Sequence, residues 1–500
     1  MRLFTWYEAG LVAGVVLVSG CGGESLEPLP SKFQAVVTGA IHSCGIVTDG
    51  GAYCWGNNDF GQLGDGSRKS HVYPVPVVGT IRYTALSGGL QHTCGIATTG
   101  AAYCWGFNLS GQLGDGTHTD RSTPAPVDGG KNWISLSAGG SYTCGIAADS
   151  LAYCWGWNAA GQLGDGTDTE RPAPTAVSGG LKFRSIGANA YHTCGLTVAG
   201  AAYCWGANQY GQLGTGNTDD SRTPALVNGG LSWVALDAGY SHSCGIAADS
   251  LAYCWGWNAA GQLGDGTDTE RPAPTAVSGG LKFRSIGANA YHTCGLTVAG
   301  AAYCWGANQY GQLGTGNTDD SRTPALVNGG LSWVALDAGY SHSCGIAAGG
   351  SGYCWGRNQF GQLGASDSVG GNGPLTPFPM AGGIEWASMN LGAYFGCGVE
   401  TPNGGAFCWG YNGSGQLGVD LPNSICTDEG GIGAQCSMDP VAVSGGLTFA
   451  SVNAHTQHAC GLSTDGAAYC WGRGSDGQLG DGRKGSQIFT IEPIRVAGQP

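Results

Sequence analysis

The sequence predicts an all-β protein folded as a β-propeller of nine four-stranded blades. Three observations lead to this fold class: a unit of about 50 residues repeats nine times, each unit contains four short extended segments, and Gly accounts for 95 of the 500 residues. Repeats of this length with the same strand-like segments are typical of propeller blades, and abundant Gly supplies tight turns between short strands. No stretch shows a sustained period of 3.6 residues, which excludes a helical solenoid.

The four segments of one unit can be followed through residues 133–177. Residues 133–138, WISLSA, alternate apolar and polar side chains, which indicates a half-buried strand. Residues 143–146 and 152–156, TCGI and AYCWG, are rich in strand-forming residues and flank a short turn, as in a hairpin. Residues 172–177, PAPTAV, carry two prolines that cannot donate to a central ladder, so this segment belongs at a sheet edge.

Each unit opens with an aromatic residue eleven positions before its first Cys. An aromatic side chain repeated in register is expected to fill the core between neighbouring units. These residues are Phe33, Tyr83, Trp133, Phe183, Trp233, Phe283, Trp333, Trp386 and Phe449. A Trp-Gly step and a Gly-Gln-Leu-Gly step follow in all nine units, the Trp being Trp55, Trp105, Trp155, Trp205, Trp255, Trp305, Trp355, Trp409 and Trp471.

The chain has 21 cysteines, and eighteen of them fall in pairs, one pair per unit. Because a turn centred between the two Cys places them opposite each other on antiparallel strands, each pair is expected to form a disulfide. Zinc would require a shorter Cys-x₂₋₄-Cys spacing, which never occurs. The pairs are Cys44–Cys54, Cys94–Cys104, Cys144–Cys154, Cys194–Cys204, Cys244–Cys254, Cys294–Cys304, Cys344–Cys354, Cys397–Cys408 and Cys460–Cys470, and a tenth, Cys426–Cys436, is expected to close an insertion at 419–438.

The cysteine left over, Cys21, follows an apolar run at residues 11–18 that is too short to span a bilayer. Val18-Ser19-Gly20-Cys21 resembles the lipobox of bacterial lipoproteins, in which the Cys becomes the N-terminus and carries the lipid. The resemblance implies a signal peptide at 1–20, a lipid-anchored tether at 21–32 and a propeller at 33–500. A plain secretory signal is the alternative, since Arg2 is a weak basic region and Glu8 is acidic.

His-Thr-Cys-Gly followed by Tyr-Cys-Trp-Gly-x-Asn-x-x-Gly-Gln-Leu-Gly resembles the repeat of the RCC1 (regulator of chromosome condensation) family over residues 33 to about 497. The resemblance implies a propeller, usually of seven blades, that binds proteins through loops on one face. Members of that family include a nuclear exchange factor for a small GTPase, ubiquitin-ligase modules and secreted inhibitors of β-lactamase. Fold alone does not choose among such functions.

Residues 144–248 and 244–348 are identical. Because exposed loops are under no structural pressure to stay identical, the cause is a very recent duplication of two units or an assembly error. A duplication implies a seven-unit ancestor. Nine units in one continuous ring keep every interface alike, whereas two dangling units would expose apolar faces, so we expect a ring of nine.

The position after Trp-Gly varies from unit to unit while its surroundings stay nearly fixed. Aromatic residues and Arg are common anchors of interfaces, so this position is the candidate partner-binding surface, with packing against the next blade as the alternative. The candidate residues are Phe107, Trp157, Trp257, Arg357, Tyr411 and Arg473. The insertions at 365–376 and 419–438 are further candidate surfaces.

Two other recurring groups are expected to be structural. Seven histidines precede the first Cys of a unit by two residues, but Tyr142 and Phe395 fill the same slot, which favours packing over metal or proton chemistry. These histidines are His42, His92, His192, His242, His292, His342 and His458. Asp165, Asp168 and Glu170 are expected to lie in a solvated turn, because their pattern lacks the remaining ligands of a calcium loop.

The net charge of −14 and the lack of a basic run argue against nucleic acid as a partner. No serine-nucleophile elbow, His-Glu-x-x-His or phosphate loop is present, so we expect no enzyme, no cofactor and no metal. The sequence therefore predicts an exported, monomeric scaffold, anchored at the cell envelope by lipid or secreted, that binds a protein partner. The alternatives are an inhibitor of a secreted enzyme, a carbohydrate-binding surface protein and, by family analogy alone, a nucleotide exchange factor.

Overall fold

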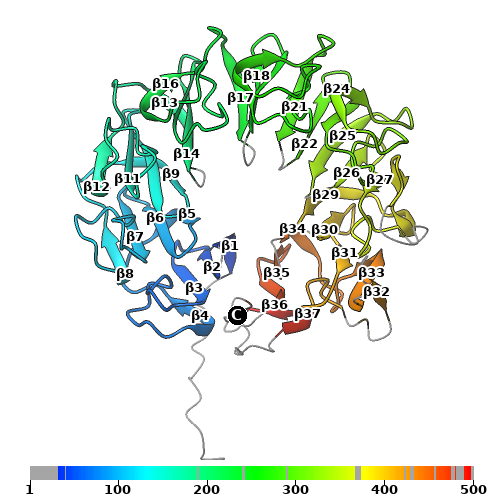
Figure 1. The fold of residues 1–500 in the computed structure, drawn as a ribbon. Helices are drawn as coiled ribbons and strands as arrows, with labels where there is room; N and C mark the ends of the chain where they lie inside the picture. The colour runs from blue at the N-terminus through cyan, green and yellow to red at the C-terminus, as the bar shows by residue number, and fades with distance from the viewer. Residues whose placement is uncertain are drawn as a thin grey trace, which may run out of the picture.

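A computed structural model describes the fold. The described residues are 32–39, 41–188, 191–238, 242–288, 291–339, 341–365, 373–392, 394–419, 421, 424–427, 433–454, 458–473, 479 and 489–496. They form nine antiparallel sheets arranged around a ring (Figure 1). The predicted nine-bladed propeller is therefore confirmed. The predicted signal peptide and the tether before Lys32, including Cys21, lie outside the described residues.

Each sheet, numbered as a blade from 1 to 9, is built from one contiguous stretch of chain. Blade 1 contains β1 (Phe33–Thr38), β2 (His42–Val47), β3 (Ala52–Gly56) and β4 (His71–Pro76); blade 2 contains β5 (Tyr83–Gly88), β6 (His92–Ala97), β7 (Ala102–Gly106) and β8 (Arg121–Pro126); blade 3 contains β9 (Trp133–Ala138), β10 (Tyr142–Ala147), β11 (Ala152–Gly156) and β12 (Arg171–Ala176).

Blades 4 to 6 repeat this pattern. Blade 4 contains β13 (Phe183–Ala188), β14 (His192–Thr197), β15 (Ala202–Gly206) and β16 (Ser221–Leu226); blade 5 contains β17 (Trp233–Ala238), β18 (His242–Ala247), β19 (Ala252–Gly256) and β20 (Arg271–Ala276); blade 6 contains β21 (Phe283–Ala288), β22 (His292–Thr297), β23 (Ala302–Gly306) and β24 (Ser321–Leu326).

The last three blades carry the insertions. Blade 7 contains β25 (Trp333–Ala338), β26 (His342–Ala347), β27 (Gly352–Gly356) and the short β28 (Phe378–Pro379), followed by the 3₁₀ turn η1 (Ala381–Gly383). Blade 8 contains β29 (Trp386–Leu391), β30 (Phe395–Glu400), β31 (Ala406–Tyr411), β33 (Gly433–Ala442) and β32 (Ile425–Thr427), and blade 9 contains β34 (Phe449–Ala454), β35 (His458–Ser463), β36 (Ala468–Arg473) and β37 (Phe489–Arg495). Blade 8 thus has five strands where four are predicted, because the 419–438 insertion adds β32 beyond β33.

The strands within a blade follow the burial that the sequence pattern predicts. All six residues of β10 are buried, since a middle strand is covered by the neighbouring blade on each side. The proline-containing β12 lies at the edge of its sheet, as predicted, and is half-buried. The fourth strands lie at the outer rim of the ring, so the first strand of each blade lies at the inner edge (Figure 1).

The ring closes by packing of blade 9 against blade 1, with no strand shared between them. The Phe33 amide donates to the Gly466 carbonyl at 2.9 Å. Phe33 and Trp55 of blade 1 lie in one buried cluster with Cys470 and Val496 of blade 9. The two ends of the propeller therefore meet through the same kind of apolar interface that separates the other blades.

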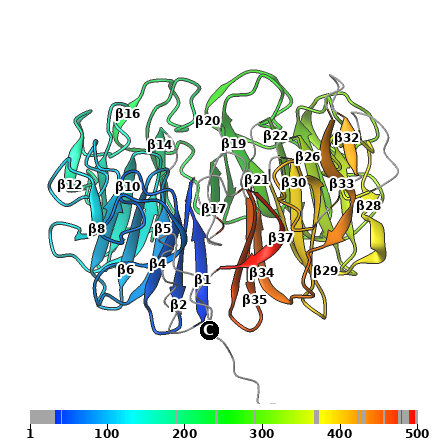
Figure 2. The ribbon, with the colours of Figure 1, turned by 90° about the horizontal axis from the view of Figure 1, so that it is seen from below.

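Figure 2 shows the ring edge-on, with the strands running between its two faces. One face, here called the loop face, carries the connections from first to second strand and from third to fourth strand. The opposite turn face carries the tight turns between second and third strands. No helix in the described part of the chain is long and apolar enough to cross a membrane.

Candidate partner-binding face

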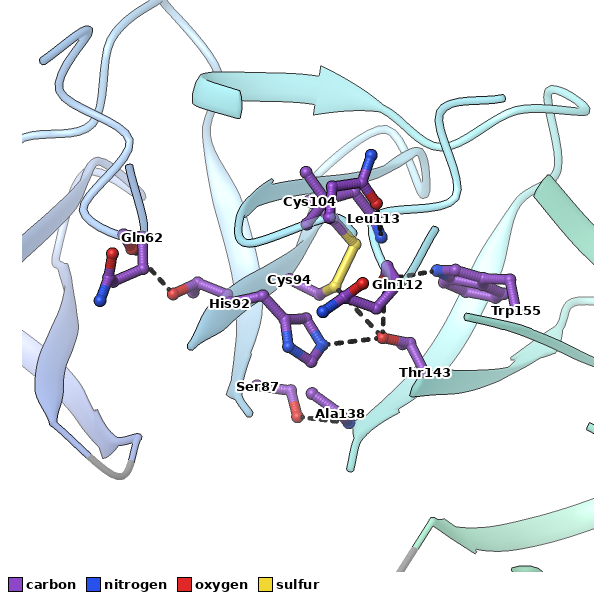
Figure 3. Close-up of a disulfide and its surroundings, with 12 residues drawn as sticks. Gln62, Ser87, His92, Cys94, Cys104, Gln112, Leu113, Ala138, Thr143 and Trp155 are labelled. Carbon is purple, nitrogen blue, oxygen red and sulfur yellow. Dashed lines mark hydrogen bonds between the residues drawn. A yellow bond between two sulfur atoms is a disulfide. The ribbon is translucent and has the colours of Figure 1, made fainter. Parts of the chain in front are cut away.

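The fixed residues of the repeat join neighbouring blades to each other. The Gln112 backbone carbonyl of blade 2 accepts hydrogen bonds from Trp155 Nε1 at 2.9 Å and from Thr143 Oγ1 at 3.0 Å, both in blade 3 (Figure 3). Gly114 has φ +72°, and a Cβ there would lie 2.7 Å from Trp155 Nε1. The Gly-Gln-Leu-Gly step is thus a loop that packs against the Trp of the following blade. Its last Gly, Gly114, has no room for a side chain.

The Asn of the repeat holds that loop in shape. Asn108 Oδ1 accepts the Leu113 amide at 2.9 Å, and Asn108 Nδ2 donates to the Thr117 and Thr119 carbonyls at 3.0 Å each. The side chain is fully buried, so these bonds satisfy groups that would otherwise be costly to bury. Its recurrence in eight of the nine units, the ninth having Gly474, is therefore explained by the loop rather than by a ligand.

The recurring histidines are buried and neutral. His92 Nε2 lies 2.9 Å from Thr143 Oγ1, and Thr143 donates its only hydroxyl proton to the Gln112 carbonyl (Figure 3). His92 must therefore donate from Nε2, which leaves Nδ1 without a proton. Burial lowers the pKa of His92 to about 3. Tyr142, in the same slot of blade 3, donates to the His192 carbonyl at 2.9 Å, so the structure agrees with a packing role.

Asp165 corrects one expectation, because it is not in a solvated turn. Its side chain is 2% exposed, and its carboxylate accepts the Thr167 amide and hydroxyl and pairs with Arg171 Nε at 2.5 Å. Burial opposes ionisation, but the hydrogen bonds from Arg171 and Thr167 outweigh it and lower the pKa of Asp165. Asp168 instead forms an exposed pair with Arg222 of blade 4 at 2.8 Å. Among the described residues no cluster of three His, Cys, Asp or Glu side chains could hold a metal ion.

The structure joins the ten cysteine pairs that the sequence predicts. In blade 3, Cys144 and Cys154 are direct cross-strand partners of β10 and β11, and the Cys94–Cys104 pair of blade 2 is drawn in Figure 3. The remaining pairs of the repeat follow the same geometry. Cys426 and Cys436 link β32 to β33 within the insertion hairpin.

The variable residues after Trp-Gly lie on the loop face, where they are half-buried except for the exposed Arg473. The Trp157 amide donates to the Ser141 carbonyl at 3.0 Å, which fixes this position at the loop-face end of the hairpin. Most of these side chains also contact a neighbouring blade. Phe107 packs on Phe60, Trp157 on Tyr191, Trp257 on Tyr291 and Tyr411 on Phe360, with ring centroids 4.7–6.0 Å apart, and the Arg357 guanidinium lies 4.5 Å from the Tyr310 ring centroid.

These side chains therefore bridge blades, as the packing interpretation predicts, and are also partly exposed. The sequence did not single out the residues beside them. Leu109, Tyr191, Tyr291 and Tyr394 are 67%, 56%, 40% and 39% exposed. Tyr191, Tyr291 and Tyr394 occupy one repeat position, directly before the second strand, that varies between units as the position after Trp-Gly does. That variation was the signal that could have revealed them.

These residues lie on the loop face of blades 2 to 6 and 8 and are here called the aromatic arc. It consists of Phe107, Leu109, Trp157, Tyr191, Trp257, Tyr291, Tyr394 and Tyr411. Exposed aromatic side chains with one polar tip suit protein interfaces. The Cys426–Cys436 hairpin adds exposed Ile425 in blade 8, whereas residues 366–372 of the other predicted insertion lie outside the described residues.

Known structures share this fold at low sequence identity. Yeast RCC1 (Prp20), in a crystal structure with Kap60, is 23% identical with a TM-score of 0.50, over 70% of this chain and 84% of that one. Prp20p from Saccharomyces cerevisiae is 20% identical with a TM-score of 0.49, over 72% and 90%. Human WBSCR16 is 19% identical with a TM-score of 0.48, over 68% and 96%. The likeness to yeast RCC1 in the complex with Kap60 concerns the fold alone.

The family is identified by the repeats themselves. The model described as "Regulator of chromosome condensation (RCC1) repeat" matches residues 49–96, 99–146, 149–196, 199–246, 249–296, 299–346 and 465–500. A second model with the same description matches residues 33–62, 83–112, 183–212, 233–262, 283–312, 333–362 and 451–478. The matches extend over more than half of the chain and repeat in phase with the blades, so this protein belongs to the RCC1 repeat family.

Proposed function

We propose that this protein is an exported, lipid-anchored scaffold that binds a protein partner at the cell envelope through the aromatic arc. The observation that carries the proposal is the contrast between the two kinds of repeat position. The fixed Trp, Gln and His make contacts between blades and the fixed Asn holds its own loop, whereas the variable positions place apolar side chains on one face. Yeast RCC1, which shares the fold, has been crystallised bound to the protein Kap60.

Site-specific photo-crosslinking tests the binding face. A benzophenone amino acid at Tyr191 or Tyr291, in the full chain expressed in its own host, should yield crosslinks to one protein partner. The matched controls are Val198 and Val298, which are 56% and 55% exposed on the turn faces of the same two blades and should yield none. Crosslinks of equal strength from both faces, or none from the loop face, would contradict the proposal.

The identified partner then allows a quantitative test. Tyr291→Ala should weaken its binding about tenfold or more, as expected for an aromatic anchor, while Val298→Ala should leave it unchanged. Binding of a soluble glycan, rather than of a protein, that depends on the same Tyr would instead assign the arc to carbohydrate.

The anchor is tested separately. Cys21→Ser should move the protein from the membrane fraction to the soluble fraction, because one or more acyl chains supply the only membrane attachment that the sequence predicts. Mass analysis of the N-terminal peptide should show acylated Cys21 in the unmodified protein. A membrane-bound Cys21→Ser protein, or an unmodified Met1 in the wild type, would overturn lipidation.

A further inference from the structure

Five of the nine blades are connected to the next blade at the inner edge by a side chain of their first strand. The fifth residue of that strand offers an oxygen to a backbone amide of the next blade, and we call this contact the clasp. Ser87 accepts the Ala138 amide at 3.1 Å (Figure 3), Ser137 that of Ala188 at 3.1 Å, Asp237 that of Ala288 at 2.8 Å, Asp337 that of Leu391 at 3.0 Å and Asn390 that of Ala454 at 2.8 Å.

Blades 4 and 6 have Gly in the clasp position, Gly187 and Gly287, and blade 1 has Val37, so these three blades offer no such oxygen to the blade that follows. Neither Gly is needed for close packing. A Cβ added at either residue would meet no atom within 4 Å, and neither has a positive φ. The missing clasp therefore leaves free space at the interface of blades 4 and 5 and at that of blades 6 and 7.

These two interfaces have the same types of residue in their buried cores but different structures, and blades 5 and 7 differ in sequence after residues 248 and 348. Between blades 6 and 7, His292 Nε2 lies 3.1 Å from Ser343 Oγ, and the adjoining cavity is about 190 Å³. Between blades 4 and 5, the cavity is about 360 Å³ and extends inward to Ser243 and Trp255. His192, only 4% exposed, lines it, and its Nε2 has no hydrogen-bond partner among the described residues.

The buried residues at the two interfaces are of the same types, so the core itself does not account for the difference. The same apolar core is therefore compatible with both an open and a closed arrangement. The open one lies across the ring from the junction of blades 9 and 1, where the chain ends meet (Figure 1). Bending at the open interface would therefore widen or narrow that junction, which no peptide bond crosses.

We propose that the interface between blades 4 and 5 is a hinge of the ring, and that the missing side chain at Gly187 permits its motion. Supplying a clasp should close it. Gly187→Ser introduces the residue that blade 3 uses at Ser137, in a strand that has room for it. Gly187→Ala adds the same Cβ without the oxygen and is the matched control.

The hinge can be measured by distances between spin labels. The labels are attached to a genetically encoded keto amino acid, because the repeat cysteines are paired in disulfides and are not available for labelling. Spin labels are chosen over chemical crosslinking with mass analysis, because peptides from the two identical copies have the same mass. One pair, at Ala199 and Ala248, spans blades 4 and 5, and the equivalent pair, at Ala299 and Ala348, spans blades 6 and 7. All four positions are exposed on the turn face.

The 199–248 distances should be longer and more broadly distributed than the 299–348 distances. Gly187→Ser should shorten and narrow only the 199–248 distribution and raise the thermal unfolding midpoint, whereas Gly187→Ala should do neither. Distributions of equal mean and width for the two pairs would overturn the hinge. An unchanged 199–248 distribution in Gly187→Ser, in a protein with wild-type circular dichroism, would overturn the role of Gly187.

Discussion

Acidification from pH 6.5 to 4 is expected to unfold this propeller. Burial lowers the pKa of His42, His192, His242 and His292 to about 4 and that of His92 and His342 to about 3, from an ordinary value near 6.5. Below pH 6.5 the unfolded chain therefore binds protons that the folded chain cannot. Each such histidine removes about 1.4 kcal/mol of stability per pH unit, and six together exceed a typical net stability of about 5–15 kcal/mol within two units.

Urea unfolding followed by Trp fluorescence at a series of pH values measures this slope. His92→Tyr, which repeats the natural choice at Tyr142, should reduce the slope between pH 6.5 and 4 by about 1.4 kcal/mol per unit. His118→Asn is the control, because His118 is exposed and its loss should not change the slope. A stability that stays constant down to pH 4 would show that the histidines are charged or accessible in the folded ring.

Loss of the hairpin disulfides is the second change expected to be severe. Each pair closes a short loop within one blade, with sequence separations of 10 or 11, and the chain-entropy model gives about 2–3 kcal/mol for a loop of this size. Nine such contributions exceed the net stability of an ordinary domain. Protein made under reducing conditions should therefore fail to form the ring, as judged by circular dichroism and size-exclusion chromatography.

Removing one disulfide at a time measures the contribution of a single pair in a ring that still folds. Replacing Cys94 and Cys104 with Ala should lower stability by about 2–3 kcal/mol, because both lie in the core between blades 2 and 3. Replacing Cys426 and Cys436 should cost the propeller less, since that pair closes the insertion hairpin at the edge of blade 8. Free thiols in the folded native protein, detected by mass after alkylation without reduction, would refute the pairing.

The sequence predicts the repeated parts of this structure well, because each repeated residue has the same physical task nine times. The edge strand at β12 follows from its prolines, and the buried slot of His92 follows from Tyr142 and Phe395 at equivalent positions. Asp165 was placed in solvent because the sequence does not show that Arg171 folds back to pair with it. The exposed Tyr191 and Tyr291 were missed because their neighbours along the surface come from another blade.

The open interface could not have been predicted at all. Residues 144–248 and 244–348 are identical, so any property that differs between the two copies arises from the parts of the ring that surround them. The clasp residues Ser137 and Asp237 are recognisable only once their backbone partners, more than 50 positions further along the chain, are known. Such long-range contacts have no local signature in one sequence.

Every blade is one contiguous repeat, and no sheet is shared between the first and last blades. Whole repeats can therefore be added to the gene or lost from it without requiring a new kind of contact between blades. Copying two repeats together reproduces interfaces that the ring already possessed: the buried residues between blades 4 and 5 recur in type between blades 6 and 7. The number of blades in this architecture can therefore change during evolution through recombination between near-identical repeats. Circumference, and with it the spacing of the arc, can evolve in a single genetic event.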